Sequence, residues 1–447
     1  MEYPGTKLTK PIRQAIFVFF LLLFFIISPI IIMYTSGYRY DFKNGLLRET
    51  GSVNIDILPT SAEAYLNNSK LKSNIPIRLN NLIAGKFSLT LKSPGYFDWQ
   101  KNIEVVNKET VYIKDVVMIK KNTAQLLTDG EIEDLSMSID KKFLIYSLRK
   151  NDTKEIWQKN IKTGENILLK TSFPDKPLTI SFSTNGNYYL VSTQEKPYKQ
   201  IIIVETQKPD KIIDLSDYSK TDILKYQWKD GYSSELYYAT PAQIMIFFPE
   251  TQSQLFVART DFVDWYMEGE KMWIIRNNTS TKKMEIIRDF LGFGSVFVEE
   301  QENLIDTWEI LMVKSDLLLL KQTNQAKMLI LTQDKKYNIS GEKFFISKYN
   351  NWLVIWTSWE IWTKAQNEEP VLLNRSGMQL QRVLTLDKYN TLGLIWAENT
   401  TVLFPYYLVS HELLSQKINT AISDSDNRIL YFGGKYENKE GLWKLEY

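Results

Sequence analysis

The segment Ser138–Tyr146 reads SIDKKFLIY, a polar turn that leads directly into an apolar strand. Three further segments repeat this pattern: STNGNYYLV at 183–191, SKYNNWLVI at 347–355 and SDSDNRILY at 423–431. Each begins with Ser and small polar residues that favour turns, and each ends in the aromatic and β-branched residues that favour strands. The recurrence of one hairpin motif indicates a fold built from repeats.

Weaker copies of the motif lead into the apolar runs at 236–238, 272–275, 317–320 and 392–396. Successive copies are 35 to 48 residues apart, which is the length of a four-stranded propeller blade. The sequence therefore predicts an all-β ring over residues 122–447 with eight blades, seven being the alternative count. These motifs resemble the TolB/WD40-like β-propeller repeats of exported bacterial proteins.

The two ends of the repeat array predict how the ring closes. The last copy stops at Tyr447, one strand short of a complete blade, whereas the run AQLLT at 124–128 stands alone before the first copy. We expect 124–128 to supply the missing outer strand, because closure of the ring removes two open sheet edges that would otherwise promote aggregation.

The N-terminal region predicts a membrane anchor. No charged residue occurs between Gln14 and Tyr38, and a helix over 15–36 would span roughly 30 Å, the thickness of the hydrocarbon layer. Three basic residues lie in the segment 1–14, which the positive-inside rule places in the cytoplasm. We expect a single-pass protein of the cell membrane whose bulk is extracytoplasmic; a cleaved signal peptide is the alternative.

Residues 51–119 alternate apolar and polar side chains in short runs, a pattern typical of a small antiparallel β-sandwich. The runs PTSAEAYL at 59–66, IPIRL at 75–79, LIAGK at 82–86 and SPGY at 93–96 resemble the signature of a PEGA domain. Ser61 and Asn68 stand where that family usually has Gly. The resemblance implies an extracytoplasmic binding or spacer module.

Composition excludes several classes of function. The formal net charge is only +2, so no basic field predicts a nucleic-acid partner. The chain has one His and no Cys, which disfavours His- or Cys-based metal sites and catalytic groups. Asp424–Asn427 lacks the Gly and Glu that complete a calcium loop, and we interpret it as a turn. We expect no metal and no cofactor.

Aromatic side chains are the remaining candidates for binding. Most tryptophans lie in apolar strands and are expected in the core, whereas Trp228 and Trp265 have polar neighbours in the sequence and are predicted to be exposed anchors. The prediction is a non-enzymatic, membrane-anchored scaffold of the cell envelope that binds a protein or a cell-wall glycan. The alternative is an exported propeller hydrolase or lyase acting on cell-wall polymers.

Overall fold

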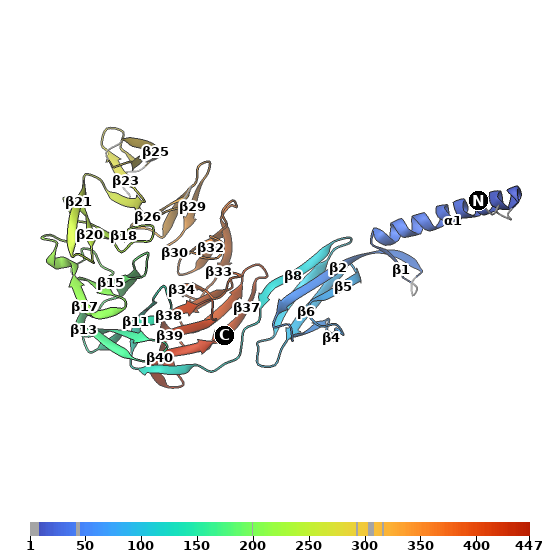
Figure 1. Ribbon diagram of the computed structural model, residues 1–447, viewed down its shortest axis with the longest axis horizontal. Helices are drawn as coiled ribbons and strands as arrows, with labels where there is room; N and C mark the ends of the chain where they lie inside the picture. Colours follow the sequence, from blue (N-terminus) through green and yellow to red (C-terminus); the bar gives the residue numbers. More distant parts are fainter. Residues whose placement is uncertain (1–8, 42–44, 199, 292–293, 303–307, 315–316) are drawn as a thin grey trace, which may run out of the picture. The chain divides into compact units, whose positions relative to one another are not determined.

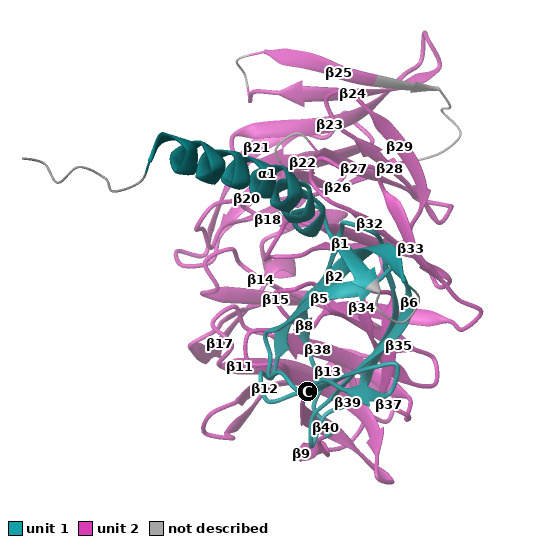
Figure 2. Ribbon diagram, turned by 90° about the vertical axis from the view of Figure 1, so that its right-hand side faces the viewer, with its two compact units in different colours: residues 1–121 teal, residues 122–447 magenta. Residues whose placement is uncertain are grey.

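A computed structural model describes residues 9–447, apart from 42–44, 199, 292–293, 303–307 and 315–316. The chain divides into two compact units, Met1–Lys121 and Asn122–Tyr447, which are coloured separately in Figure 2. Apart from one helix and one short 3-10 turn, the described residues form strands and loops, which confirms the predicted all-β class.

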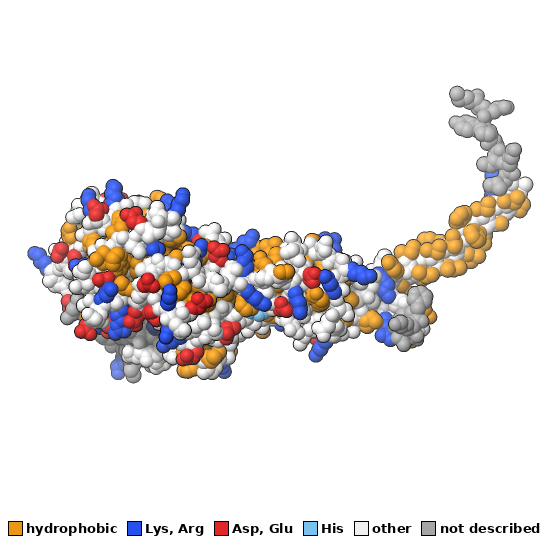
Figure 3. Space-filling model, turned by 90° about the horizontal axis from the view of Figure 1, so that it is seen from below, with side chains coloured by type: hydrophobic (Ala, Val, Ile, Leu, Met, Phe, Trp, Pro, Cys, Tyr) orange, Lys and Arg blue, Asp and Glu red, His pale blue; other side chains and the backbone are white. Residues whose placement is uncertain are grey.

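The helix α1 (Lys10–Thr35) begins the first unit. It is 26 residues long, carries Pro29, and none of its residues is buried. Its surface is almost wholly apolar (Figure 3), and its length and hydropathy are sufficient to cross a membrane. The same properties occur in signal sequences. Arg39 Nη1 donates to the carbonyl oxygen of Tyr34 at 2.6 Å, and this bond ties the last turn of α1 to the following strand.

The rest of the first unit is a β-sandwich of two four-stranded sheets. One sheet has the order β1-β2-β5, with β8 pairing parallel to β2, and the other has the order β4-β3-β6-β7. Burial alternates along β2, where Val53, Ile55 and Ile57 are buried, and Trp99 on the first position of β7 in the other sheet is fully buried too. The strands are β1 (Tyr38–Asp41), β2 (Leu46–Leu58), β3 (Glu63–Leu66), β4 (Ser69–Lys70), β5 (Ile77–Ile83), β6 (Gly85–Lys92), β7 (Trp99–Val105) and β8 (Thr110–Val117).

The second unit is a β-propeller with eight four-stranded blades (Figure 1). Blades 1 to 7 are consecutive meanders. Blades 1 to 4 comprise β10 (Ile132–Met137), β11 (Phe143–Lys150), β12 (Thr153–Asn160), β13 (Asn166–Pro174), β14 (Leu178–Phe182), β15 (Tyr188–Thr193), β16 (Ile201–Glu205), β17 (Lys208–Asp214), η1 (Leu215–Asp217), β18 (Lys225–Trp228), β19 (Leu236–Ala239), β20 (Gln243–Phe248), β21 (Ser253–Arg259), β22 (Asp264–Glu268), β23 (Lys271–Asn278), β24 (Lys283–Asp289) and β25 (Ser295–Glu302).

Blade 8 joins strands from both ends of the propeller. Its sheet has the order β38-β39-β40-β9, so a strand from before blade 1 pairs with the last strand of the chain. Blades 5 to 8 comprise β26 (Trp308–Lys314), β27 (Leu317–Gln322), β28 (Lys327–Leu331), β29 (Lys336–Ser340), β30 (Lys343–Ile346), β31 (Leu353–Trp356), β32 (Glu360–Lys364), β33 (Val371–Arg375), β34 (Leu380–Thr385), β35 (Leu392–Trp396), β36 (Thr400–Phe404), β37 (Val409–Leu414), β38 (Ile418–Asp424), β39 (Ile429–Tyr436), β40 (Lys439–Glu446) and β9 (Gln125–Asp129).

Neighbouring blades are held together by apolar clusters and by side chains of the first strands. Leu319 and Met328 of blade 5, for example, share a core with Leu353 of blade 6. The Gln227 side-chain amide donates to the Met267 carbonyl oxygen at 2.7 Å and accepts from the Met267 N–H at 2.9 Å. The first strands of neighbouring blades do not pair with each other, so their buried backbone groups need side-chain partners of this kind. These links make the ring a rigid frame for its loops.

Candidate functional site

The loops of the propeller gather at the two ends of the ring. Because successive strands of a blade are antiparallel, every first strand begins at one end, which we call the entry end. The loop from the first to the second strand of each blade, and the loop from the third to the fourth, lie at the other end, which we call the exit end. Cavities occur at both ends.

A charged network lines a cavity of about 480 Å³ at the entry end. Lys154 is buried there, with its Nζ 2.7 Å from Glu133 and 2.8 Å from Asp134. Asp134 also accepts hydrogen bonds from the Ser147 hydroxyl at 2.7 Å and from the Leu178 backbone N–H at 3.0 Å. The carboxylate of Asp134 is therefore engaged in joining blade 1 to blade 2.

A second pair, of a partly buried lysine and a buried aspartate, lines a cavity of about 360 Å³ at the same end. Lys225 Nζ lies 2.9 and 2.8 Å from the two carboxylate oxygens of Asp264, and Asp264 accepts the Ile310 backbone N–H at 2.7 Å. Burial lowers the pKa of Lys225, while the Asp264 charge opposes that shift. These three residues belong to blades 3, 4 and 5, so the pair links three blades.

The chemistry of the entry end follows from these contacts. Glycoside hydrolysis needs one protonated carboxyl and one carboxylate placed on either side of a sugar. Glu133, Asp134 and Asp264 instead contact lysine ammonium groups. Buried charges paired in this way act mainly as fixed structural links, because removal of either partner leaves an uncompensated charge.

The exit end carries an ionic cluster centred on Asp426. Lys348 Nζ lies 3.0 and 2.9 Å from its two carboxylate oxygens, and Lys141 and the Tyr349 hydroxyl also donate to it. Hydrogen bonds from Lys141, Tyr349 and Lys348, in that order, hold the pKa of Asp426 well below its usual range. Asp424 pairs with Lys141 at 2.6 Å, so the carboxylates of the Asp424–Asn427 turn face lysines.

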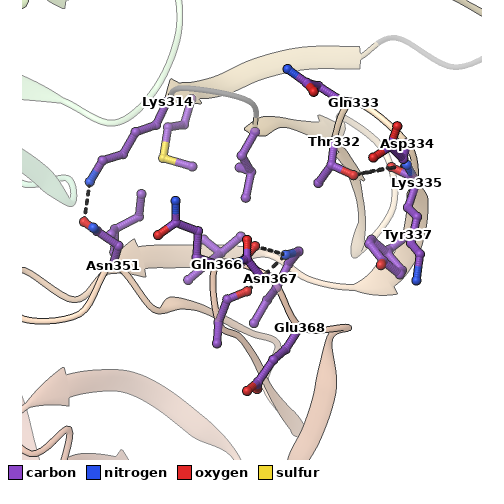
Figure 4. A pocket seen from close by; sticks show the side chains of 16 residues that line it. Lys314, Thr332, Gln333, Asp334, Lys335, Tyr337, Asn351, Gln366, Asn367 and Glu368 are labelled. Carbon is purple, nitrogen blue, oxygen red and sulfur yellow. Dashed lines mark hydrogen bonds between the residues drawn. The ribbon is translucent and has the colours of Figure 1, made fainter.

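A separate pocket of about 410 Å³ lies at the exit end between blades 5 and 6 (Figure 4). One wall is the blade 5 loop that carries Thr332–Lys335, and the opposite wall is the blade 6 loop that carries 366–368. Lys314 and Asn351 join the two blades at one end of the pocket through a 2.8 Å hydrogen bond. The apolar part of the lining consists of Met312, Leu317, Tyr337, Ile346 and Leu353.

A buried lysine also lines this pocket. Lys364 is 4% exposed, and its Nζ donates to the carbonyl oxygens of Ala365 at 3.1 Å and Gln366 at 3.2 Å. Burial lowers the pKa of Lys364. Within the described residues no carboxylate lies at ion-pair distance from it, in contrast to the lysines at the entry end.

The predicted aromatic anchors lie elsewhere than expected. Trp228 and Trp265 are 9% and 2% exposed, so the prediction that they are exposed is wrong. The Trp228 indole N–H donates to Ser181 of the neighbouring blade, at 3.1 Å to the hydroxyl and 3.3 Å to the carbonyl. A binding role for either residue stays a prediction. Trp265 does line the 360 Å³ cavity beside Lys225.

Comparison with known proteins identifies the sandwich. Residues 50–120 match the PEGA domain. The match thus covers β2 from residue 50 onward and the strands β3 to β8, and leaves the helix and the propeller outside. None of the curated proteins is a detectable relative of this chain.

Similar solved structures include two propellers and a peptidase. The β-propeller domain of Cps50 (Swd1) from Myceliophteria thermophila is 11% identical, with 73% of this chain and 98% of that chain covered and a TM-score of 0.45. The Dos1 propeller is 9% identical, with coverages of 69% and 92% and a TM-score of 0.47. Dipeptidyl peptidase 4 from Porphyromonas gingivalis is 9% identical, with coverages of 70% and 57% and a TM-score of 0.45. The fold assignment rests on the eight sheets themselves.

Sequence reasoning missed the pocket between blades 5 and 6. The segments EIWQK at 155–159 and EIWTK at 360–364 are copies of one strand, and this repeat locates the strand but not the pocket beside it. In both copies the Trp indole N–H donates to the side chain of the Glu two residues earlier, at 3.0 and 3.1 Å. The final lysines, Lys159 and Lys364, are therefore equivalent positions of blades 1 and 6.

Proposed function

We propose that this chain is a membrane-anchored, extracytoplasmic binding protein of the cell envelope, which recognises a protein or a cell-wall glycan through its propeller. The observation that carries the proposal is the contrast between the two ends of the ring. Acidic side chains at the entry end are engaged by lysines and by backbone N–H groups of other blades. The exit end has a 410 Å³ pocket with apolar and polar lining, which is the usual character of a ligand site.

The PEGA domain and the apolar helix support the proposed location. The helix ends at Thr35 and the PEGA match begins at residue 50, and Lys10 and Arg13 lie at the N-terminal end of the helix. This order fits a signal anchor that holds a spacer module and then a propeller outside the membrane.

The orientation predicts a protease-protection result. Protease added to intact protoplasts should digest the PEGA domain and the propeller and leave a small membrane fragment that contains α1. Gel analysis with antibodies against each unit would detect this. Protection of residues 39–447 until the membrane is permeabilised would contradict the orientation.

Binding without turnover is the second expected result. The full chain in detergent should be retained on purified cell wall or on an immobilised envelope protein, whereas residues 1–121, which lack the propeller, should be retained less. Mass spectrometry of the supernatant should find no released sugar or peptide. His411→Ala should leave retention unchanged, because His411 packs edge-on against Phe404 at 5.9 Å between ring centres, on an outer strand. Release of fragments that depends on a propeller carboxylate would favour a hydrolase or lyase instead.

A further inference from the structure

We infer that the pocket between blades 5 and 6 binds a sugar that carries a carboxylate. The inference rests on the proposed binding function and names the ligand class for one site. It depends on the pocket's size, its mixed lining and the buried ammonium group of Lys364.

The volume and the lining fit a small polar ligand with apolar faces. A volume of about 410 Å³ is within the range of small-molecule sites, roughly 300–1,000 Å³. The Tyr337 ring and the side chains of Leu317 and Ile346 offer apolar surface to the C–H face of a pyranose. Asn351, Gln366 and Asn367 add amides, which both donate and accept hydrogen bonds and so suit sugar hydroxyl groups.

The positive charge of Lys364 is the reason to expect a carboxylate on the bound sugar. An ammonium group has three N–H donors, and Lys364 uses two of them on the carbonyl oxygens of Ala365 and Gln366. The Nζ also lies 6.0 Å from the centre of the Tyr337 ring, and no oxygen acceptor for the third N–H is found among the described residues. A carboxylate in the pocket would accept it and also compensate a charge that is largely removed from water.

The other charged residues of the pocket are paired or exposed. Lys335 pairs with Glu369 at 2.7 Å, and Lys314 donates to Asn351. Asp334 and Glu368 lie on exposed loop tips, where solvent ions screen their repulsion of an anion. Burial lowers the pKa of Lys364 and the charge of Glu368 opposes that shift, so Glu368 compensates part of the lysine charge from the loop. Lys364 is thus the cation best placed to attract the ligand's carboxylate.

Blade 1 provides a matched control for the structural role of this lysine. Lys159 occupies the equivalent position, is buried, and donates its Nζ to the Gly164 carbonyl at 3.1 Å within its own loop. Burial lowers the pKa of Lys159 as well. Lys159 lines none of the cavities described above, so it holds its loop as Lys364 does without facing a pocket.

The test is a titration of the full chain in detergent with D-glucuronate and N-acetylmuramate, followed by saturation-transfer NMR, against the neutral controls D-glucose and N-acetylglucosamine. The acidic sugars should bind at least about tenfold more tightly than the neutral ones, the factor expected for one charge-assisted hydrogen bond. Lys364→Met should remove that preference, whereas Lys159→Met should keep it. Equal melting temperatures of the two variants would show that both fold.

Gln366→Trp is a second variant that tests the place of binding, since it fills the mouth of the pocket from an exposed loop. It should abolish the signal of the acidic sugars. Unchanged binding in Gln366→Trp, equal binding of acidic and neutral sugars, or complete displacement by an equal concentration of inorganic phosphate would each overturn the inference. If retention on cell wall persists while the sugars fail to bind, the inference fails and the binding function stands.

Discussion

Replacement of Gln125–Asp129 by a glycine-serine segment of the same length is expected to destabilise the propeller as a whole. These residues form β9, which pairs with β40 through Trp443↔Leu126 and Leu442↔Thr128, while Leu127 packs on the cluster that joins blades 8 and 1. Loss of about four ladder hydrogen bonds at roughly 1 kcal/mol each lowers the free energy of unfolding by about 4 kcal/mol. The melting temperature should fall by about 8 °C, at roughly 2 °C per kcal/mol for a domain of this size.

Tryptophan fluorescence can follow this transition, because Trp99 is the only tryptophan outside the propeller. The same replacement at β33, an outer strand of equal length in blade 6, is the control. It leaves β9 and β40 paired, so the ring stays closed and the loss should be smaller. The β9 variant should also associate through the exposed edge of β40. A monomeric β9 variant that melts like the parent chain would refute the role of this strand in closure.

The fold could be predicted because each blade repeats one local signal. The four strong hairpin copies are all at the junction of the first and second strands of a blade, where a turn must precede a buried strand. The single strand 124–128 could be assigned because an array that ends one strand short needs a partner for its last edge. The structure pairs Gln125–Asp129 with that edge.

The exposed anchors could not be predicted correctly because both faces of a blade are covered by its neighbours. In the sequence alone, the polar residues beside Trp228 predict an exposed side chain. In the structure Gln227 binds the backbone of Met267 and Lys225 binds Asp264, both in blade 4, so these polar side chains are themselves directed at the next blade. In a two-layer protein, alternating apolar and polar residues along a strand indicate that one face of the sheet is exposed to solvent. The same alternation does not indicate exposure in a propeller, because each blade packs against a neighbour on both faces.

The pocket between blades 5 and 6 was beyond prediction for a different reason. Its walls come from the loops at 332–335 and 364–368, which have no common sequence pattern. Their proximity follows from the ring geometry, which sets neighbouring third-to-fourth-strand loops side by side. The sequence repeat predicts the strands of each blade, whereas a binding pocket depends on the loops, whose sequences differ from blade to blade.

Asp264→Ala is expected to be the most destabilising single substitution at the entry end. It leaves the ammonium of Lys225, whose side chain is 18% exposed, without a counter-charge, and leaves the Ile310 N–H without its acceptor. Breaking a buried pair in this way costs about 3–5 kcal/mol. The melting temperature should fall by about 6–10 °C, at roughly 2 °C per kcal/mol, whereas Glu369→Ala, which breaks the exposed pair with Lys335, should change it little.

The double variant Lys225→Met/Asp264→Leu separates the charge from the packing. It removes both charges and keeps similar volumes, so it should recover most of the stability that Asp264→Ala loses, apart from the cost of the unsatisfied Ile310 N–H, about 1–3 kcal/mol. Recovery would show that Asp264 chiefly compensates Lys225, because a residue needed only for its backbone hydrogen bond could not be rescued by removing the lysine charge. A double variant as unstable as Asp264→Ala would instead assign the whole effect to the link between blades 4 and 5.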